Sequence, residues 1–446
     1  MKEKKKDRWK KAAVLIFWLA VWQGAAYLIH NRILLAGPVE VIQRLLIELG
    51  KKSFYYSVFG TMGRILFGFF LGLTAGILFG SIAYRFKTVA LFLEPVVLAM
   101  KSIPVAAFVV LILIWVGSDR LAIPIAFLVV FPYLYIGVKT GLSETNRELL
   151  QMAESYDMRL WNKLWHIYRP AVMPYVTNAV KVTVGMAFKS GIAAEVIGIP
   201  NFSIGERLYI SKIYLDTEGV LAWTVVVLLL SSLCEKGILF LIRVCTKSGM
   251  AVIGGSRSED RQPEEKVCFP PMEKHYDNGA VITTPPLMLE KEGRTGIMGE
   301  SGCGKTTWIK LLLERKECRA STVFQEDRLC ESYSAVDNVR MVCARENAGN
   351  IRQELAKLLP EDAIDRPVSN LSGGMRRRVA VVRACLAGGN ILLLDEPLTG
   401  LDEENRQRTA AYILEHQNGR KILFTTHRAE DIGLFRANCT EFVKKN

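Results

Sequence analysis

Closely spaced cysteine pairs are missing from this sequence. Its nine cysteines include no CxxC motif, and seven of them lie from residue 268 onward. Zinc sites are usually built from cysteines and histidines at such short spacings. The pattern therefore argues against a zinc site, and it indicates reduced thiols in a cytosolic part of the protein.

Acidic residues are also scarce relative to basic ones. The 446 residues include 44 Asp and Glu against 57 Lys and Arg, which gives a formal net charge of +13. A basic chain suits either nucleic acid or an anionic membrane surface. Many of the basic residues flank apolar segments, which favours membrane lipid as a partner and argues against nucleic acid.

Apolar residues are abundant, at 50% of the chain, and they concentrate before about residue 245. A helix needs about 20 mainly apolar residues to cross about 30 Å of hydrocarbon. Pro95, Lys101 and Pro104 predict that one such span is broken or kinked. Between the first two spans, 38–52 is expected to form an amphipathic helix that starts with proline. About six segments have the composition of a span: 12–30, 57–84, 88–116, 121–140, 172–198 and 219–243.

The distribution of basic residues predicts the orientation, because cytoplasmic segments carry an excess of Lys and Arg. Residues 1–11 contain seven of them, so we expect the N-terminus inside. Six crossings then place segment 141–170 and the C-terminal half in the cytoplasm too. The first apolar run lacks a small-residue cleavage site, so we expect a retained helix of a multi-pass protein in the cytoplasmic (inner or plasma) membrane.

The sequence GESGCGKT at 299–306 matches the phosphate-binding pattern G-x4-GK[ST]. A strand-like segment precedes it and a helical one follows, so its glycines let backbone N–H groups surround phosphate oxygens at a helix N-terminus. Lys305 is expected to reach the β- and γ-phosphates of ATP, and Thr306 to ligate Mg²⁺. The expected nucleotide-binding residues of this loop are Gly299, Ser301, Gly302, Cys303, Gly304, Lys305, Thr306 and Thr307.

A second cluster of motifs runs from Leu371 to Asp402. A Ser-Gly-Gly turn opens a basic helix, and the apolar run 391–394, which predicts a strand buried on both faces, leads into an Asp-Glu pair. This cluster resembles the ATP-binding cassette (ABC) family. LSGGM at 371–375 is similar to its signature motif, 391–395 to its Walker B motif, and 401–402 to its D-loop.

The resemblance to the ABC family implies roles for individual residues. Asp395 would hold Mg²⁺ through its hydration shell, and Glu396 would polarise the water that attacks the γ-phosphate. Gln325 matches the Q-loop position, where its amide contacts Mg²⁺ or the attacking water. His427 matches the switch histidine at the γ-phosphate. Tyr276 is a candidate for stacking on adenine, although an ordinary surface aromatic is nearly as good an interpretation.

The ABC resemblance also implies an assembly. ATP is closed between the phosphate loop of one subunit and the signature turn Ser372, Gly373 and Gly374 of another, with Asp402 at the junction. One chain has one of each, so we expect a homodimer. Lys305 and Gln325 are only 20 positions apart, which predicts a shortened β-subdomain. Little chain follows His427, so we expect no C-terminal regulatory domain.

The N-terminal half resembles the permeases of binding-protein-dependent importers. Segment 148–175 is similar to their EAA coupling segment, with Gln151-Met152-Ala153 on the EAA triplet and Asp157 on the family glycine. Asp tolerates the left-handed conformation better than most residues, so the bend can survive. Segments 101–117 and 193–208 resemble the nitrate/sulfonate/taurine subfamily. This likeness implies a separate extracytoplasmic solute-binding protein as a partner.

These observations predict an α-helical, MetI-like transmembrane permease domain followed by an α/β P-loop ABC ATPase domain. The expected boundaries are 1–247 for the permease, 248–270 for a linker and 271–446 for the ATPase. Strands are expected at 294–298, 321–325, 390–395, 421–426 and 440–443.

Three charged residues lie inside the expected fifth span, namely Lys181, Lys189 and Glu195. Charges inside membrane segments indicate functional sites by default. One interpretation is a polar translocation path, with Lys181 suited to an anion. The other, which we weight more, is snorkelling, pairing within the helix or a satisfied contact with another span.

The function expected from the sequence is ATP-driven import of a small solute, coupled to the permease through 148–170. An ABC exporter is the first alternative, because exporters commonly fuse the two halves in this order. A membrane-tethered regulatory ATPase without transport is the second.

Overall fold

The computed structural model describes residues 2–31, 33–247, 266–275, 281–284, 286–290, 293–299, 303–315, 320–343 and 346–441. The chain divides into two compact units. The permease unit comprises 1–144 and 172–248, and the ATPase unit comprises 145–171 and 249–446. Segment 145–171, which we call the coupling segment, therefore packs with the ATPase although it lies in the permease half of the sequence.

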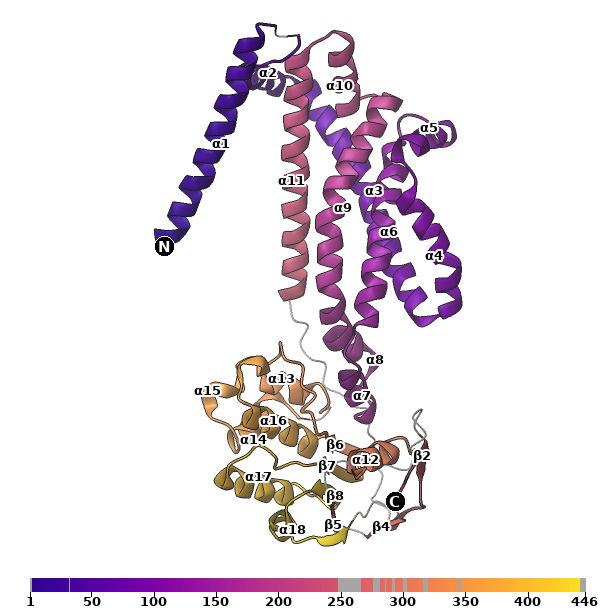
Figure 1. Ribbon diagram of the computed structural model, residues 1–446, viewed down its shortest axis with the longest axis vertical. Helices are drawn as coiled ribbons and strands as arrows, with labels where there is room; N and C mark the ends of the chain where they lie inside the picture. Colours follow the sequence, from indigo (N-terminus) through magenta and orange to yellow (C-terminus); the bar gives the residue numbers. More distant parts are fainter. Residues whose placement is uncertain are drawn as a thin grey trace. The chain divides into compact units, whose positions relative to one another are not determined.

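Helices make up all the regular structure in the described part of the permease unit (Figure 1). The long apolar runs of the sequence account for them, because a helix satisfies its own backbone groups in lipid. They are α1 (Lys2–Ile29), α2 (Pro38–Leu49), α3 (Lys52–Arg85), α4 (Lys87–Ser102), α5 (Val105–Val116), α6 (Ala122–Ser143), α9 (Arg169–Gly198), α10 (Ile204–Ile213) and α11 (Thr217–Lys247).

Glycines allow α3 and α6 to pack closely. A Cβ atom at Gly68 would lie 2.2 Å from the carbonyl oxygen of Ile123, and one at Gly76 would lie 2.5 Å from Cβ of Leu134. Both distances are shorter than van der Waals contact, so only glycine fits. Small residues four apart are a common way for membrane helices to bring their backbones together. The pair α3 and α6 thus forms the centre of the permease unit.

By length and composition, fewer described helices qualify as membrane spans than the six segments expected. Among the described residues, α3, α6 and α11 are long and apolar enough to cross a membrane, and α4 with α5 adds a fourth if this bent pair counts as one span. The bend is 106° and falls where Pro104 precedes α5, as the prolines predict. The first expected span contains a shorter apolar helix, Ala13–Ile29. The fifth is the helix α9, whose internal charges lower its hydropathy.

The ATPase unit is built on a parallel sheet in the order β6-β7-β8-β5-β9. Its strands are β5 (Arg294–Met298), β6 (Ala320–Val323), β7 (Ile391–Asp395), β8 (Lys421–Thr426) and β9 (Asn438–Glu441), close to the five expected ones. Strand β7 is fully buried along its apolar run, with Leu392 and Leu394 in one apolar cluster and Ile391 and Leu393 in another. The prediction of a strand buried on both faces is confirmed.

Two small antiparallel sheets accompany the main one: β1 (Lys266–Phe269) pairs with β4 (Leu287–Glu290), and β2 (Glu273–His275) with β3 (Val281–Thr283). Strand β1 falls inside the expected linker 248–270, because its alternating burial packs Val267 and Phe269 into the core. The rest of that linker, 248–265, lies outside the described residues. Besides those of the coupling segment, the described helices of this unit are α12 (Lys305–Leu313), α13 (Ala335–Arg340), α14 (Ala348–Ala356), α15 (Glu361–Ile364), the 3₁₀ turn Val368–Asn370, α16 (Gly373–Leu386), α17 (Glu403–Glu415) and α18 (Ala429–Phe435).

Candidate nucleotide site and coupling segment

The phosphate loop joins β5 to α12. Gly304 has φ +112°, a conformation that favours glycine, and it lets α12 begin at Lys305. Lys305 is 7% exposed, and its Nζ donates a hydrogen bond to the carbonyl oxygen of Gly299 at 2.6 Å. The ammonium therefore points back into the loop, where phosphates would lie. Ser301, Gly302 and Tyr276 lie outside the described residues.

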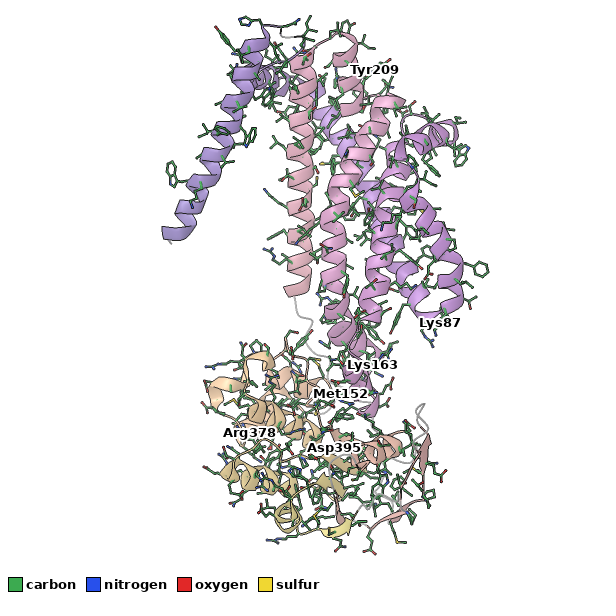
Figure 2. The ribbon with its side chains drawn as sticks, in the orientation of Figure 1. Lys87, Met152, Lys163, Tyr209, Arg378 and Asp395 are labelled. Atoms are coloured by element: carbon green, nitrogen blue, oxygen red, sulfur yellow. The ribbon has the colours of Figure 1, made fainter. Side chains whose placement is uncertain are left out.

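Asp395 ends β7 and is 2% exposed (Figure 2). Its Oδ1 accepts a hydrogen bond from the hydroxyl of Thr425 at 2.6 Å. Burial raises the pKa of this carboxyl above its usual range, and the hydroxyls of Thr425 and Thr306 offset part of that rise. The two hydroxyls thus support a charged carboxylate in a place that water reaches poorly.

Two further oxygen-bearing side chains, those of Thr306 and Gln325, lie beside this carboxylate. The hydroxyl of Thr306 donates to Oε1 of Gln325 at 3.4 Å, and it lies near enough to Asp395 to lower the pKa of that carboxyl. Hydroxyl, amide and carboxylate oxygens are the hard ligands that Mg²⁺ takes, usually together with water and phosphate. The residues present therefore fit a magnesium ion, and the structure brings together the three residues that the sequence predicted for it.

Glu396 is held in an unusual conformation. Its φ is +49°, which costs free energy for a non-glycine residue. Its backbone N–H donates to the hydroxyl of Thr425 at 3.0 Å, and its Oε2 accepts from the hydroxyl of Thr399 at 3.2 Å. Nδ1 of His427 lies 3.7 Å from its Oε1. The structure thus brings the two residues expected at the γ-phosphate next to each other.

The signature turn and the D-loop form a second group. Ser372 caps α16 by accepting a hydrogen bond from the N–H of Met375, and Asp402 caps α17 in the same way from Asn405. The backbone and side-chain N–H groups of Asn405 donate to Asp402 and lower the pKa of its carboxyl. A Cβ at Gly374 would lie 3.4 Å from the carbonyl oxygen of Gly400, so the two turns are neighbours. Both caps are exposed, as an intersubunit surface requires.

Several residues of the site were not anticipated from the sequence. Thr425 links Asp395 to the backbone of Glu396. Arg377, on α16, donates to the carbonyl oxygens of Phe324 and Gln325 at 2.6 and 2.5 Å. Arg377 is buried in a helix that carries three further arginines, so no local signal in the sequence singled it out. Its partners are 53 and 52 residues away, a pairing that only the folded chain reveals.

The coupling segment is embedded in the ATPase core. It consists of α7 (Arg147–Ser155), the short helix Leu160–Asn162 and a π-helical turn, Lys163–Tyr168. Met152 and Ala153 are 1% and 0% exposed, and they share an apolar cluster with Val323 of β6. The left-handed bend is present, because Asp157 has φ +45°. The helix, its bend and its attachment to the ATPase agree with the expectation from the sequence.

Tyr156 connects the coupling segment to the elements of the nucleotide site. Its hydroxyl donates to the carbonyl oxygen of Thr322 at 2.6 Å, three residues before Gln325. The guanidinium of Arg383 on α16 lies 5.4 Å from the ring centre. Burial raises the pKa of this phenol, so it stays a hydrogen-bond donor. Asn162 adds a second link, to the carbonyl oxygen of Met341 at 3.3 Å.

Among the charges of α9, Glu195 makes a satisfied contact with another helix. It is 0% exposed, and it accepts hydrogen bonds from the hydroxyl of Thr61 at 2.7 Å and from Nε of Arg64 at 3.0 Å, both on α3. This is the structural interpretation weighed from the sequence. Lys181 and Lys189 are exposed on the surface of the permease unit.

Two family models match the chain. Residues 72–235 match the family described as binding-protein-dependent transport system inner membrane component, and residues 284–399 match the family described as ABC transporter. Together with the long apolar helices, the first match indicates a multi-pass inner-membrane protein. The second identifies the site described above as that of an ATP-binding domain.

Curated relatives match the ATPase half. The molybdenum import ATP-binding protein ModC of Haemophilus ducreyi is 32% identical over 35% of this chain and 53% of its own length. The Nod factor export ATP-binding protein I of Cupriavidus metallidurans is 30% identical, over 35% and 61%. The taurine import ATP-binding protein TauB of Pseudomonas aeruginosa is 29% identical, over 36% and 70%.

The chain thus spans 53% and 61% of the lengths of the first two of these relatives. Both family matches agree with the resemblances found in the sequence, and each falls within one half of the chain. The chain therefore carries two regions in one polypeptide, a helical region that belongs to the binding-protein-dependent permease family and a P-loop region that belongs to the ABC ATPase family.

Proposed function

We propose that this protein imports a small solute across the cytoplasmic membrane at the expense of ATP. The observation that carries the proposal is the coupling segment, which is joined in sequence to α6 and α9 of the permease and buried in the ATPase core. Through Tyr156 it contacts β6, the strand that leads to Gln325. A movement of Gln325 at the γ-phosphate can therefore be transmitted through β6 and Tyr156 to the coupling segment, which continues into the permease helices.

In this proposal the phosphate loop binds ATP, and Lys305 neutralises the β- and γ-phosphates. Thr306, Gln325 and Asp395 would hold Mg²⁺, which supplies charge neutralisation on the phosphates when bound. Glu396 orients and polarises the attacking water, and its φ of +49° fixes the carboxylate beside Thr399. His427 stands next to it to contact the γ-phosphate.

The working unit is a homodimer. The exposed signature turn, Ser372 to Gly374, and the adjoining Asp402 form the surface that covers the ATP of a second copy. A ligand shifts a conformational equilibrium only by its different affinity for the two states. ATP has this difference, because only the closed dimer contacts it from both sides. The ATPase domains lie in the cytoplasm, and a solute-binding protein delivers the solute from the other side.

Export is the second candidate, and one observation favours it. A relative named for Nod factor export is about as similar as the two named for import. The match of 72–235 to the binding-protein-dependent permease family supports import. A membrane-tethered regulatory ATPase is the third candidate, and the coupling segment argues against it.

The full chain reconstituted in proteoliposomes tests the proposal. We expect its ATP hydrolysis to rise when a candidate solute-binding protein is added together with its ligand. Stimulation by lipid or by hydrophobic compounds alone, without any binding protein, would support export and overturn the import proposal.

A further inference from the structure

The segment that carries Gln325 has no regular backbone pairing of its own. Strand β6 ends at Val323, and residues 324–328, which we call the Gln325 segment, form neither helix nor strand. Carbonyl groups outside a ladder need other hydrogen-bond partners, and a functional side chain is only as well placed as its supports. Gln325 itself is exposed. Its position beside Thr306 therefore depends on what holds its main chain.

Arg377 on α16 holds the main chain of Gln325. It is 7% exposed, and its two terminal nitrogens donate to the carbonyl oxygens of Phe324 at 2.6 Å and of Gln325 at 2.5 Å. Hydrogen bonds from a charged donor are stronger than neutral ones. The same guanidinium lies 3.2 Å from a carboxylate oxygen of Asp327, which balances its charge. Arg377 is thus fully engaged with the Gln325 segment.

Arg383, six residues further along α16, holds the other end of the segment. It is 0% exposed, and it donates to the carbonyl oxygens of Asp327 at 3.0 Å and Arg328 at 2.8 Å. It is also the arginine beside the ring of Tyr156 in the coupling segment. The two arginines therefore have different tasks, because Arg377 alone contacts the main chain of the residue expected to bind Mg²⁺.

The helix that carries Arg377 begins at the signature turn. Ser372 caps this helix, and Arg377 follows five residues later, about 7.5 Å along the axis. We propose that Arg377 is a positioning residue for ATP hydrolysis. It fixes the main chain of Gln325 to the helix of the signature turn, so that the amide oxygen of Gln325 reaches Mg²⁺ beside the other two ligands. This inference rests on the proposed role of Gln325 in holding Mg²⁺.

Metal binding without turnover tests this role. Mn²⁺, which takes the same oxygen ligands as Mg²⁺, is titrated into the detergent-solubilised full chain with a non-hydrolysable ATP analogue, and free Mn²⁺ is measured by electron paramagnetic resonance. We expect Arg377→Met to raise the Mn²⁺ dissociation constant about tenfold, because Gln325 loses its hydrogen bond from a charged group. Loss of a positive charge would by itself strengthen cation binding, so a weakening reports the displaced ligand. An unchanged or lower dissociation constant would overturn the proposal.

Two further variants separate positioning from folding. Arg377→Lys keeps the charge and one donor, so it should raise the dissociation constant only about threefold. If Arg377→Met does not fold, Arg377→Lys decides the test, and no rise would overturn the proposal. Arg420 is the matched control, because it is also 7% exposed and donates to the carbonyl oxygens of Cys385 at 2.7 Å and Ala387 at 3.0 Å, at the other end of α16.

Arg420→Met should lower the temperature of thermal unfolding and leave the Mn²⁺ dissociation constant within about twofold of the parent value. Affinity for the nucleotide without metal should stay within about twofold in all these variants, since the phosphate loop is unchanged. If Arg420→Met weakens Mn²⁺ binding as much as Arg377→Met, the effect is a general loss of structure and the proposal fails.

A double variant shows whether Arg377 acts through Gln325. Gln325→Ala alone should weaken Mn²⁺ binding about tenfold, and adding Arg377→Met should weaken it by no more than about twofold further, because both changes remove the same ligand. Effects that multiply would overturn the proposal. If Gln325→Ala has no effect, the proposed role of Gln325 fails and this inference with it. If Gln325→Ala weakens binding and Arg377→Met does not, the inference alone fails, and neither result depends on the direction of transport.

Discussion

Asp395 in the ATPase unit and Glu195 in the permease unit are both buried carboxylates, at 2% and 0% exposure, and each accepts a hydrogen bond from a threonine hydroxyl. They differ in what balances their charge. Glu195 lies 3.0 Å from the guanidinium of Arg64. Within the described part of the chain, no Lys or Arg side chain lies within 4.0 Å of the Asp395 carboxylate.

This difference separates a structural carboxylate from one that awaits a ligand. A buried charge needs a partner, either within the protein or from outside. Arg64 meets that need for Glu195 and also donates to the carbonyl oxygen of Phe202, so the group ties α3 to α9 and the loop after it. Asp395 has oxygen neighbours in Thr306 and Gln325, which suit Mg²⁺.

The largest effect is expected at Glu396, directly beside Asp395. Glu396→Gln should lower the turnover of ATP by about 10² to 10⁴-fold, because it removes the group that polarises the attacking water. ATP should still bind, so the variant should retain nucleotide. ATP hydrolysis and nucleotide retention in the full chain check this. Glu404→Gln, an exposed residue at the start of α17, is the control. Retained hydrolysis in Glu396→Gln would contradict the assignment.

The next largest effect is expected at Glu195, the carboxylate whose charge is balanced by Arg64. Arg64→Met leaves Glu195 buried without its cation, which should lower the free energy of unfolding by about 3–5 kcal/mol. The double variant with Glu195→Gln should recover much of that loss, because no uncompensated charge remains. Thermal unfolding of the detergent-solubilised chain measures it. Equal losses in the single and double variants would show that the pair is not coupled.

The two threonines give a matched pair of smaller changes. Thr61→Val and Thr425→Val each remove a hydroxyl donor from a buried carboxylate, which should cost about 1–3 kcal/mol at each site. For Thr61 we expect the loss mainly in the thermal stability of the permease unit. For Thr425 we expect weaker binding of Mg²⁺, so that half-maximal hydrolysis needs a higher Mg²⁺ concentration. If both variants changed only stability, the distinction between the two carboxylates would fail.

The smallest effect tests the connection between the units. Tyr156→Phe keeps the buried ring and removes the hydrogen bond to Thr322, worth about 1 kcal/mol. ATP hydrolysis should continue while the solute moved per ATP falls several-fold. Tyr412→Phe, whose hydroxyl lies elsewhere in the ATPase unit, is the control. A proportional fall of hydrolysis and transport would assign Tyr156 a role in folding alone.

The two carboxylates also differ in how well they could be predicted from the sequence. Asp395, Glu396 and the phosphate loop were predictable, because the residues that define them are contiguous and end strands of a parallel sheet. Asp157 was predictable as a bend, because few residues tolerate its conformation. Glu195 could be interpreted only as one of several possibilities, since Thr61 and Arg64 are 134 and 131 residues away.

The membrane spans show the same limit of prediction from the sequence alone. Composition alone counted six segments, but 12–30 contains only a shorter apolar helix and α9 carries four charged residues. The path from Tyr156 to Thr322 crosses 166 residues and leaves no local pattern. Pairings of this kind depend on tertiary packing, which no short stretch of sequence encodes.

Directional transport in sealed proteoliposomes tests the central proposal most directly. The chain is oriented with its ATPase domain outside, the solute-binding protein and labelled solute are enclosed, and ATP is added outside. We expect labelled solute to leave the lumen toward the ATPase side, as import requires, and Glu396→Gln to stop it. ATP-dependent accumulation of solute in the lumen, or hydrolysis without any movement in either direction, would contradict the account.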